Sequence, residues 1–119
     1  KREITNTPLQ AFVLMNDTQF VEASRNIAQS AMQKSDTPEE IITHIARLII
    51  SRPMRESEIK VVRSTYNDAL TEFTATPEEA TKLIKVGDSV ADPKLSTPKL
   101  AAWTIVANQI LNMDETLNK

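Results

Sequence analysis

The sequence predicts an all-α fold, a compact irregular bundle of five to six helices with the C-terminal helix at its centre. Its 119 residues include a single glycine, Gly87, whereas β-hairpins and phosphate-binding loops use glycine for positive φ angles or close backbone approach. Apolar residues recur at helical spacing, and no segment alternates with a period of two. This length suits one hydrophobic core, so we expect a single domain over residues 1–119, the C-terminal part of a larger protein.

Four Thr-Pro pairs mark expected helix starts. Threonine caps a helix by accepting a backbone N–H bond, and proline fits the next position because its missing N–H costs nothing there. The stretch TPEE occurs at 37–40 and again at 76–79. Its acids favour the positive end of the helix dipole, and Glu40 and Glu79 occupy the capping-box position. Unequal spacing argues against a repeat. The pairs are Thr7-Pro8, Thr37-Pro38, Thr76-Pro77 and Thr97-Pro98.

The first half of the chain predicts three helices. A short helix is expected over 8–16, a second follows Asp17 as its N-cap, and a third covers 38–51 and is closed by Pro53. Residues at helical spacing should face inward. They are Leu9, Phe12 and Val13 in the first helix, Phe20, Ala23, Ser24, Ile27, Ala28 and Ala31 in the second, and Ile41, Ile42, Ile45, Leu48 and Ile49 in the third.

The second half predicts three more helices and one loop. A long helix is expected over 56–75 and a shorter one over 77–86, with Gly87 as its C-cap. The loop covers 88–96. The expected inward residues are Ile59, Val62, Tyr66, Ala69, Leu70 and Phe73 in the long helix, and Ala80, Leu83 and Ile84 in the short one.

The last expected helix, over 98–112, is apolar on most of its circumference. Such a helix is usually enclosed by its neighbours, and this places it at the centre of the bundle. The aromatic residues fall on the inward stripes and are interpreted as core. They are Phe12, Phe20, Tyr66, Phe73 and Trp103.

Residue types that carry common chemistry are scarce. No cysteine is present, which excludes a thiolate nucleophile, Cys-ligated zinc and thioether-linked haem within this chain. His44 is the single histidine and has no second ligand at metal spacing, so we interpret it as a solvated or half-buried helix residue. The single glycine argues against a nucleotide-binding loop. We therefore expect no catalytic residue, no metal site and no cofactor.

Five basic residues surround the corner between the expected third and fourth helices. Such a corner could present a helix to a DNA groove or bind an anion. The net charge of the chain is −2, however, and we interpret the corner as a solvated hairpin whose arginine stems cover apolar surface, with no nucleic-acid partner. The five residues are Arg47, Arg52, Arg55, Lys60 and Arg63.

Polar residues that follow the last helix form another candidate cluster. Asn112, Asp114 and Glu115 would meet Asn16 and Asp17 if the first helix packs beside the last. A calcium-like oxygen cluster is one interpretation, and polar capping of two helix ends is the favoured one.

Two runs at opposite ends of the chain resemble one family. TNTPLQAFVLMNDTQFVEASRNIA at 5–28 and LAAWTIVANQILNMDETL at 100–117 are similar to the C-terminal domain of unknown function of large planctomycete proteins. Many of these proteins also carry a planctomycete-type cytochrome c domain. SRPMRESE at 51–58 is similar to the family's Gly-Arg-x-Pro-x-x-x-Glu turn, with Ser51 where glycine is usual. The resemblance implies a polar structural network drawn from Asn6, Gln10, Asn16, Asp17, Arg52, Asn112, Asp114 and Glu115.

The resemblance also sets the functional expectation. It implies a periplasmic or exported cell-envelope location and carries over no catalytic residue. We expect a non-catalytic helical structural or interaction module whose partner is the rest of the parent protein or another envelope protein. The longest apolar run, 11–15, is far below the roughly 20 residues that span a bilayer, so no membrane insertion is expected. The alternative is an accessory domain that completes an enzyme active site elsewhere in the parent, with Arg52, Asp114 or Glu115 reaching in.

Overall fold

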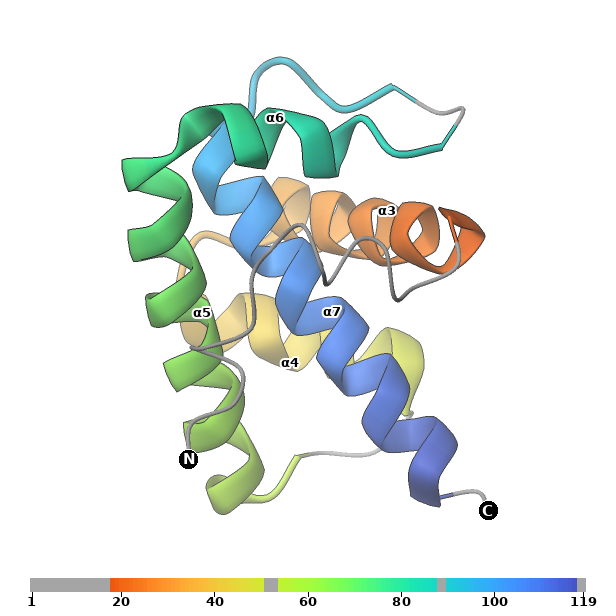
Figure 1. The fold of residues 1–119 in the computed structure, drawn as a ribbon. Coiled ribbons are helices and arrows are strands. Elements are labelled where there is room, and N and C mark those ends of the chain that lie inside the picture. The colour runs from red at the N-terminus through yellow and green to blue at the C-terminus, as the bar shows by residue number, and fades with distance from the viewer. Residues whose placement is uncertain (1–17, 51–53, 88–89, 118–119) are drawn as a thin grey trace.

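The computed structural model describes residues 18–50, 54–87 and 90–117, and within them the chain is all-α. Five helices occupy this part of the chain (Figure 1). The predicted fold class is confirmed, and the helix expected over 8–16 lies outside the described residues. The helices are α3 (Thr18–Lys34), α4 (Pro38–Ile49), α5 (Glu56–Ala75), α6 (Pro77–Ile84) and α7 (Thr97–Leu117).

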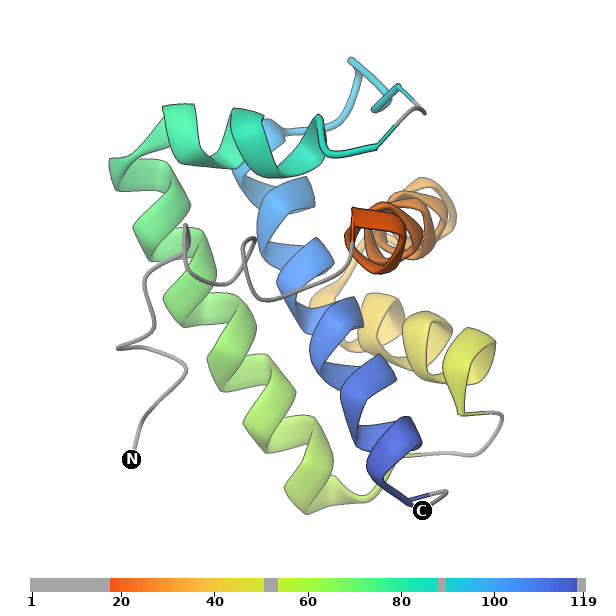
Figure 2. The same ribbon diagram turned by 45° about the vertical axis from the view of Figure 1, so that its right-hand side comes forward.

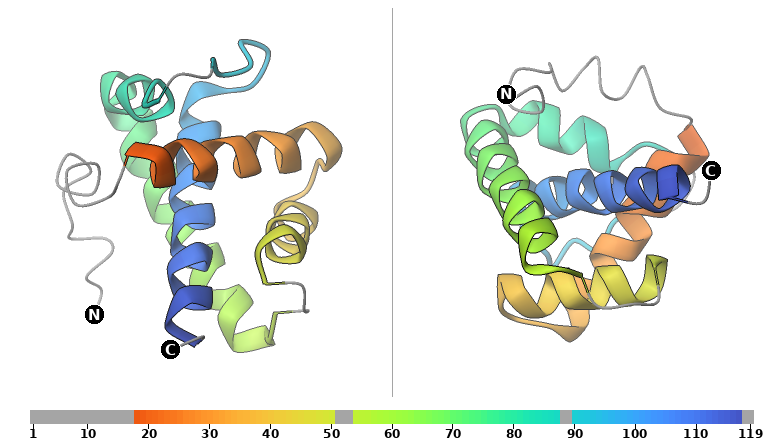
Figure 3. Two further views of the ribbon diagram at one scale, coloured as in Figure 1. Left: turned by 90° about the vertical axis from the view of Figure 1, so that its right-hand side faces the viewer. Right: turned by 90° about the horizontal axis from the view of Figure 1, so that it is seen from below.

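Helix α7 is the centre of the bundle, as predicted. It packs against α3, α4, α5 and α6, and it runs between them in every view (Figures 1 and 2). All residues from 100 to 108 are buried. Seen from below, α7 lies in the middle of the molecule with the other helices around it (Figure 3, right), which is why an apolar circumference is stable there. The helix continues to Leu117, past the predicted end near residue 112.

Within this core, Trp103 of α7 and Tyr66 of α5 stack face to face. Both side chains are buried. Burial raises the pKa of the Tyr66 hydroxyl, and a hydrogen bond with Trp103 and the charge of Arg63 partly oppose that shift. The aromatic pair therefore joins the longest outer helix of the described chain to the central one.

The two TPEE stretches start their helices in different ways. Thr37 caps α4, since its Oγ1 accepts from the Glu40 N–H at 3.3 Å. Thr76 makes no such cap bond. Its Oγ1 donates instead to the Glu72 carbonyl at 2.9 Å, because Thr76 follows α5 directly and its hydroxyl completes the last turn of that helix.

The inward faces of two helices differ from the predicted stripes. In α3, Ala23 is exposed and Ile27 only half-buried, whereas Val21 and Arg25 are buried. The prediction was wrong for Ala23, which at 100° per residue points away from the buried residues Val21 and Ala28, whereas Ile27 still packs against the core from the edge of the buried face. In α4, Leu48 is 53% exposed; it is turned about 90° from the centre of the buried face at 100° per residue. Phe20 falls among the side chains that are not described.

Candidate functional site

A polar assembly joins α3 to the loop before α7. Arg25, Gln29 and Gln33 recur at four-residue spacing and lie on one side of α3. Arg25 Nη1 donates to Gln29 Oε1 at 2.9 Å and to the Val90 carbonyl at 3.5 Å. Gln29 Oε1 also accepts from the Asp92 N–H at 2.9 Å. These three side chains form what we call the α3 ladder, and they hold residues 90–92 against α3.

Asp92 ends the α3 ladder on the loop side. Its Oδ2 accepts from Gln33 Nε2 at 2.9 Å, and its Oδ1 accepts from the Lys94 N–H at 3.0 Å. The Lys94 N–H bond, followed by the Gln33 bond, lowers the pKa of the Asp92 carboxyl. The carboxylate thus both shapes the turn at 92–95 and ties it to the helix.

Arg25 is the one fully buried charged side chain of the described residues. Burial lowers the pKa of its guanidinium, and the nearby Glu22 partly opposes that shift. An arginine stays protonated at neutral pH even so. A second buried polar contact lies close by in sequence, where Asn108 Nδ2 of α7 donates to Ser24 Oγ at 3.2 Å. Arg25 Nη1, Ser24 Oγ and Asn108 Nδ2 are therefore engaged in structural bonds.

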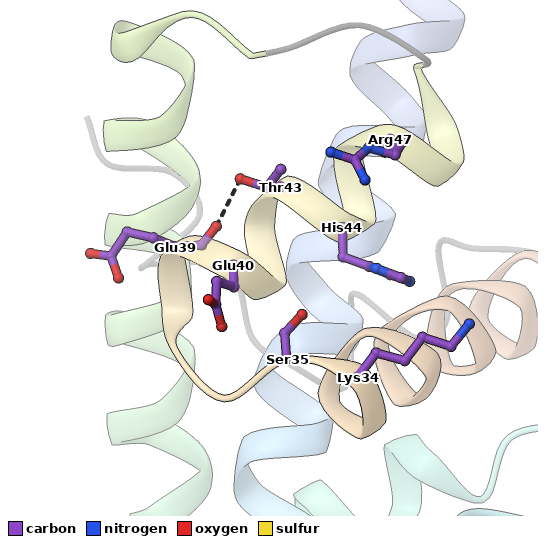
Figure 4. A pocket seen from close by; sticks show the side chains of 7 residues that line it. All are labelled: Lys34, Ser35, Glu39, Glu40, Thr43, His44 and Arg47. Atoms are coloured by element: carbon purple, nitrogen blue, oxygen red, sulfur yellow. Dashed lines mark hydrogen bonds between the residues drawn. The ribbon is translucent and has the colours of Figure 1, made fainter.

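A hollow of about 390 Å³ opens between the end of α3 and the outer side of α4. Figure 4 shows its lining side chains: Glu40, His44 and Arg47 follow one another along α4, and Lys34 projects from the end of α3. His44 is half-buried, and its Nε2 is covered without a hydrogen-bond partner. The hollow is lined by Lys34, Ser35, Glu39, Glu40, Thr43, His44 and Arg47.

The acids of the hollow have partners elsewhere. The Glu39 carboxylate points away from it (Figure 4) and forms an ion pair with Arg63 of α5. A backbone N–H bond, and then the Arg63 bond, lower the pKa of Glu39. Glu40 Oε1 accepts from the Asp36 N–H at 3.4 Å. Lys34 and Arg47 have no ion pair among the described residues.

The site residues expected from sequence are only partly described. Asn6, Gln10, Asn16, Asp17 and Arg52 lie outside the described residues. Asn112, Asp114 and Glu115 lie within the last turns of α7 rather than after it, and their side chains are not described. Their assignment to a polar network stays a prediction.

The basic residues expected at the corner between α4 and α5 do not form one cluster in the described structure. Arg63 pairs with Glu39, and Arg55 is the N-cap residue of α5, where its N–H donates to Glu58 Oε1 at 2.8 Å. Arg47 instead lines the hollow with Lys34. The α3 ladder was not predicted, because Arg25, Gln29 and Gln33 lie outside the predicted apolar stripe of this helix, where polar residues are typical of a solvated face. No local pattern pairs them with Asp92, which is 59 residues beyond Gln33.

Among the described residues, no group of three or more His, Cys, Asp or Glu side chains is placed to hold a metal ion. No described helix has the length and hydrophobicity needed to cross a lipid bilayer.

Comparison with known proteins identifies one family. The family model described as PSD1, protein of unknown function (DUF1553), matches residues 1–66, more than half of the chain. The match includes the runs at 5–28 and 51–58, and the run at 100–117 lies beyond it. Searches of the curated proteins and of the solved structures found no match.

Proposed function

The chain belongs to the PSD1 (DUF1553) family of unknown function, and from this premise we propose that it is a non-catalytic helical structural or interaction module. Its parent is a larger exported protein of the planctomycete type that the terminal runs resemble. Its partner is the rest of that protein or another protein of the cell envelope.

The observation that carries this proposal is how the fold uses Arg25. A buried cation under a loop is a frequent feature of catalytic sites. Here the guanidinium is bonded to Gln29 and to the Val90 carbonyl, and the same Gln29 oxygen holds the Asp92 N–H. Arg25 and Gln29 thus hold the loop at 90–92 against α3 through hydrogen bonds. Because these bonds fix the loop relative to α3, the domain can present a rigid surface to a binding partner.

Cross-linking of the full-length parent protein tests the proposal. Lysine-reactive cross-linking followed by mass spectrometry should join exposed lysines of this domain, such as Lys60 and Lys85, to defined sites in another part of the parent or in one co-purified protein. If the intact parent protein yields only cross-links within this domain, the proposed interaction role is wrong.

The accessory-domain alternative makes a separate prediction. If residues near the end of α7 complete an active site elsewhere, exchanging Asp114 and Glu115 for Asn and Gln abolishes the parent's activity while the cross-links persist. In a pure interaction module, the same exchanges leave any activity of the parent unchanged. The two measurements therefore distinguish docking from catalysis.

A further inference from the structure

We propose that the hollow between α3 and α4 binds an oxyanion, a phosphate or carboxylate group on a small ligand, through Lys34, His44 and Arg47. This site is independent of the docking function proposed above. It rests on the placement of charge around the hollow and on the hydrogen-bonding capacity of its walls.

The cations of the hollow are available and its acids are engaged. Lys34 and Arg47 have no ion pair in the described part of the chain, and both side chains are exposed. Glu39 is paired with Arg63 on the far side of α4. Glu40 receives the Asp36 N–H and lies one turn before His44 on the same side of α4. Lys34 and Arg47 therefore leave two positive charges at the hollow that no ion pair among the described residues neutralises.

The spacing of the cations suits one small anion. His44 and Arg47 are three residues apart on α4, which places them on the same side of that helix. Lys34 reaches the same wall from the last turn of α3. An ammonium group supplies three donors and a guanidinium a planar fork that matches phosphate and carboxylate oxygens.

His44 supplies the polar centre of this wall. Its imidazole lies between the Lys34 and Arg47 side chains in Figure 4, and its covered Nε2 has no hydrogen-bond partner within the protein. A buried polar atom without a partner costs free energy. The Ser35 and Thr43 side chains complete the lining. Thr43 Oγ1 donates to the Glu39 carbonyl at 2.9 Å.

Proton NMR of the imidazole ring provides the test, because the chain contains one histidine and so one set of ring signals. The 119-residue chain is titrated with inorganic phosphate, and separately with acetate, at fixed pH and ionic strength. We expect a saturable shift of the His44 ring signals with at least one of the two anions, and the arm that saturates identifies phosphate or carboxylate as the group bound. Glycerol, a neutral solute, should produce no shift.

Three variants locate the binding. Lys34→Gln and Arg47→Gln should each weaken the affinity by about 1.4-fold to fivefold, the range for one exposed charge pair, and the double variant should weaken it further. Lys60→Gln is the matched control, since it removes the same charge from an exposed position on α5 outside the hollow. Circular dichroism confirms that each variant is folded. Linear, non-saturating shifts with both anions, or equal weakening by Lys60→Gln, would overturn the proposal.

Discussion

The indole of Trp103 lies against the phenol ring of Tyr66, with ring centroids 3.8 Å apart and planes 16° from parallel. Trp103 is 1% exposed and Tyr66 6% exposed. The pair connects the central helix α7 to α5. Trp103 is the largest fully buried side chain of the described residues.

Replacing Trp103 with alanine should lower the free energy of unfolding by roughly 3–5 kcal/mol, because a large side chain is lost and its cavity cannot collapse. Urea unfolding followed by circular dichroism measures the change. Leu48→Ala is the control: Leu48 is 53% exposed, and its removal should cost less than about 1 kcal/mol. If Trp103→Ala keeps the unfolding midpoint of the parent chain, the central placement of α7 is wrong.

The two TPEE threonines should respond differently to alanine. Thr37→Ala removes the cap bond to the Glu40 N–H and should cost about 1 kcal/mol. Thr76 makes no cap bond, and its hydroxyl only donates to the Glu72 carbonyl, so Thr76→Ala should cost less than about 0.5 kcal/mol. Equal losses of unfolding free energy in the two variants would contradict this assignment of the caps.

The α3 ladder should make stability depend on acid pH. The pKa of Asp92 is lowered in the folded state, so its stabilising contribution is complete at neutral pH. It is lost as the pH falls from about 4, the ordinary aspartate value, through the lower folded pKa.

Asp92→Asn tests that dependence. The variant should be less stable than the parent chain at pH 7, and the two urea midpoints should converge as the pH falls through the lowered folded pKa of Asp92, because the parent carboxyl then becomes protonated as well. Glu39, whose pKa is lowered as well, is unchanged in both proteins and titrates equally in each. A midpoint difference that stays constant across this pH range would show that the Asp92 charge plays no part.

Gly87 should resist substitution for two separable reasons. Its φ is +95°, a conformation that costs a residue with a Cβ roughly 1–2 kcal/mol. A Cβ there would also collide with the Glu22 side chain of α3. Gly87→Ala should therefore lower the free energy of unfolding by more in the parent chain than in a Glu22→Ala background, where only the backbone cost remains. Identical losses in the two backgrounds would exclude the collision with Glu22.

The helix starts and the fold class could be predicted from local sequence. Thr37 with Pro38 and two acids specifies a helix start by short-range hydrogen bonding and dipole effects. The pattern over 56–75 matches the bounds of α5. The central position of α7 also followed from the sequence, because a helix with apolar residues on most sides is stable only when neighbours cover it.

Tertiary structure alone decided which polar residues meet. Gln33 and Asp92 are 59 residues apart and Ser24 and Asn108 are 84 apart, so no local pattern pairs them. The burial of Arg25 depends on the loop that passes over α3, and the regrouping of Arg47 with Lys34 depends on how α3 and α4 pack. Helix formation is governed by contacts within four residues, whereas the packing of helices and loops selects the side chains that share a site.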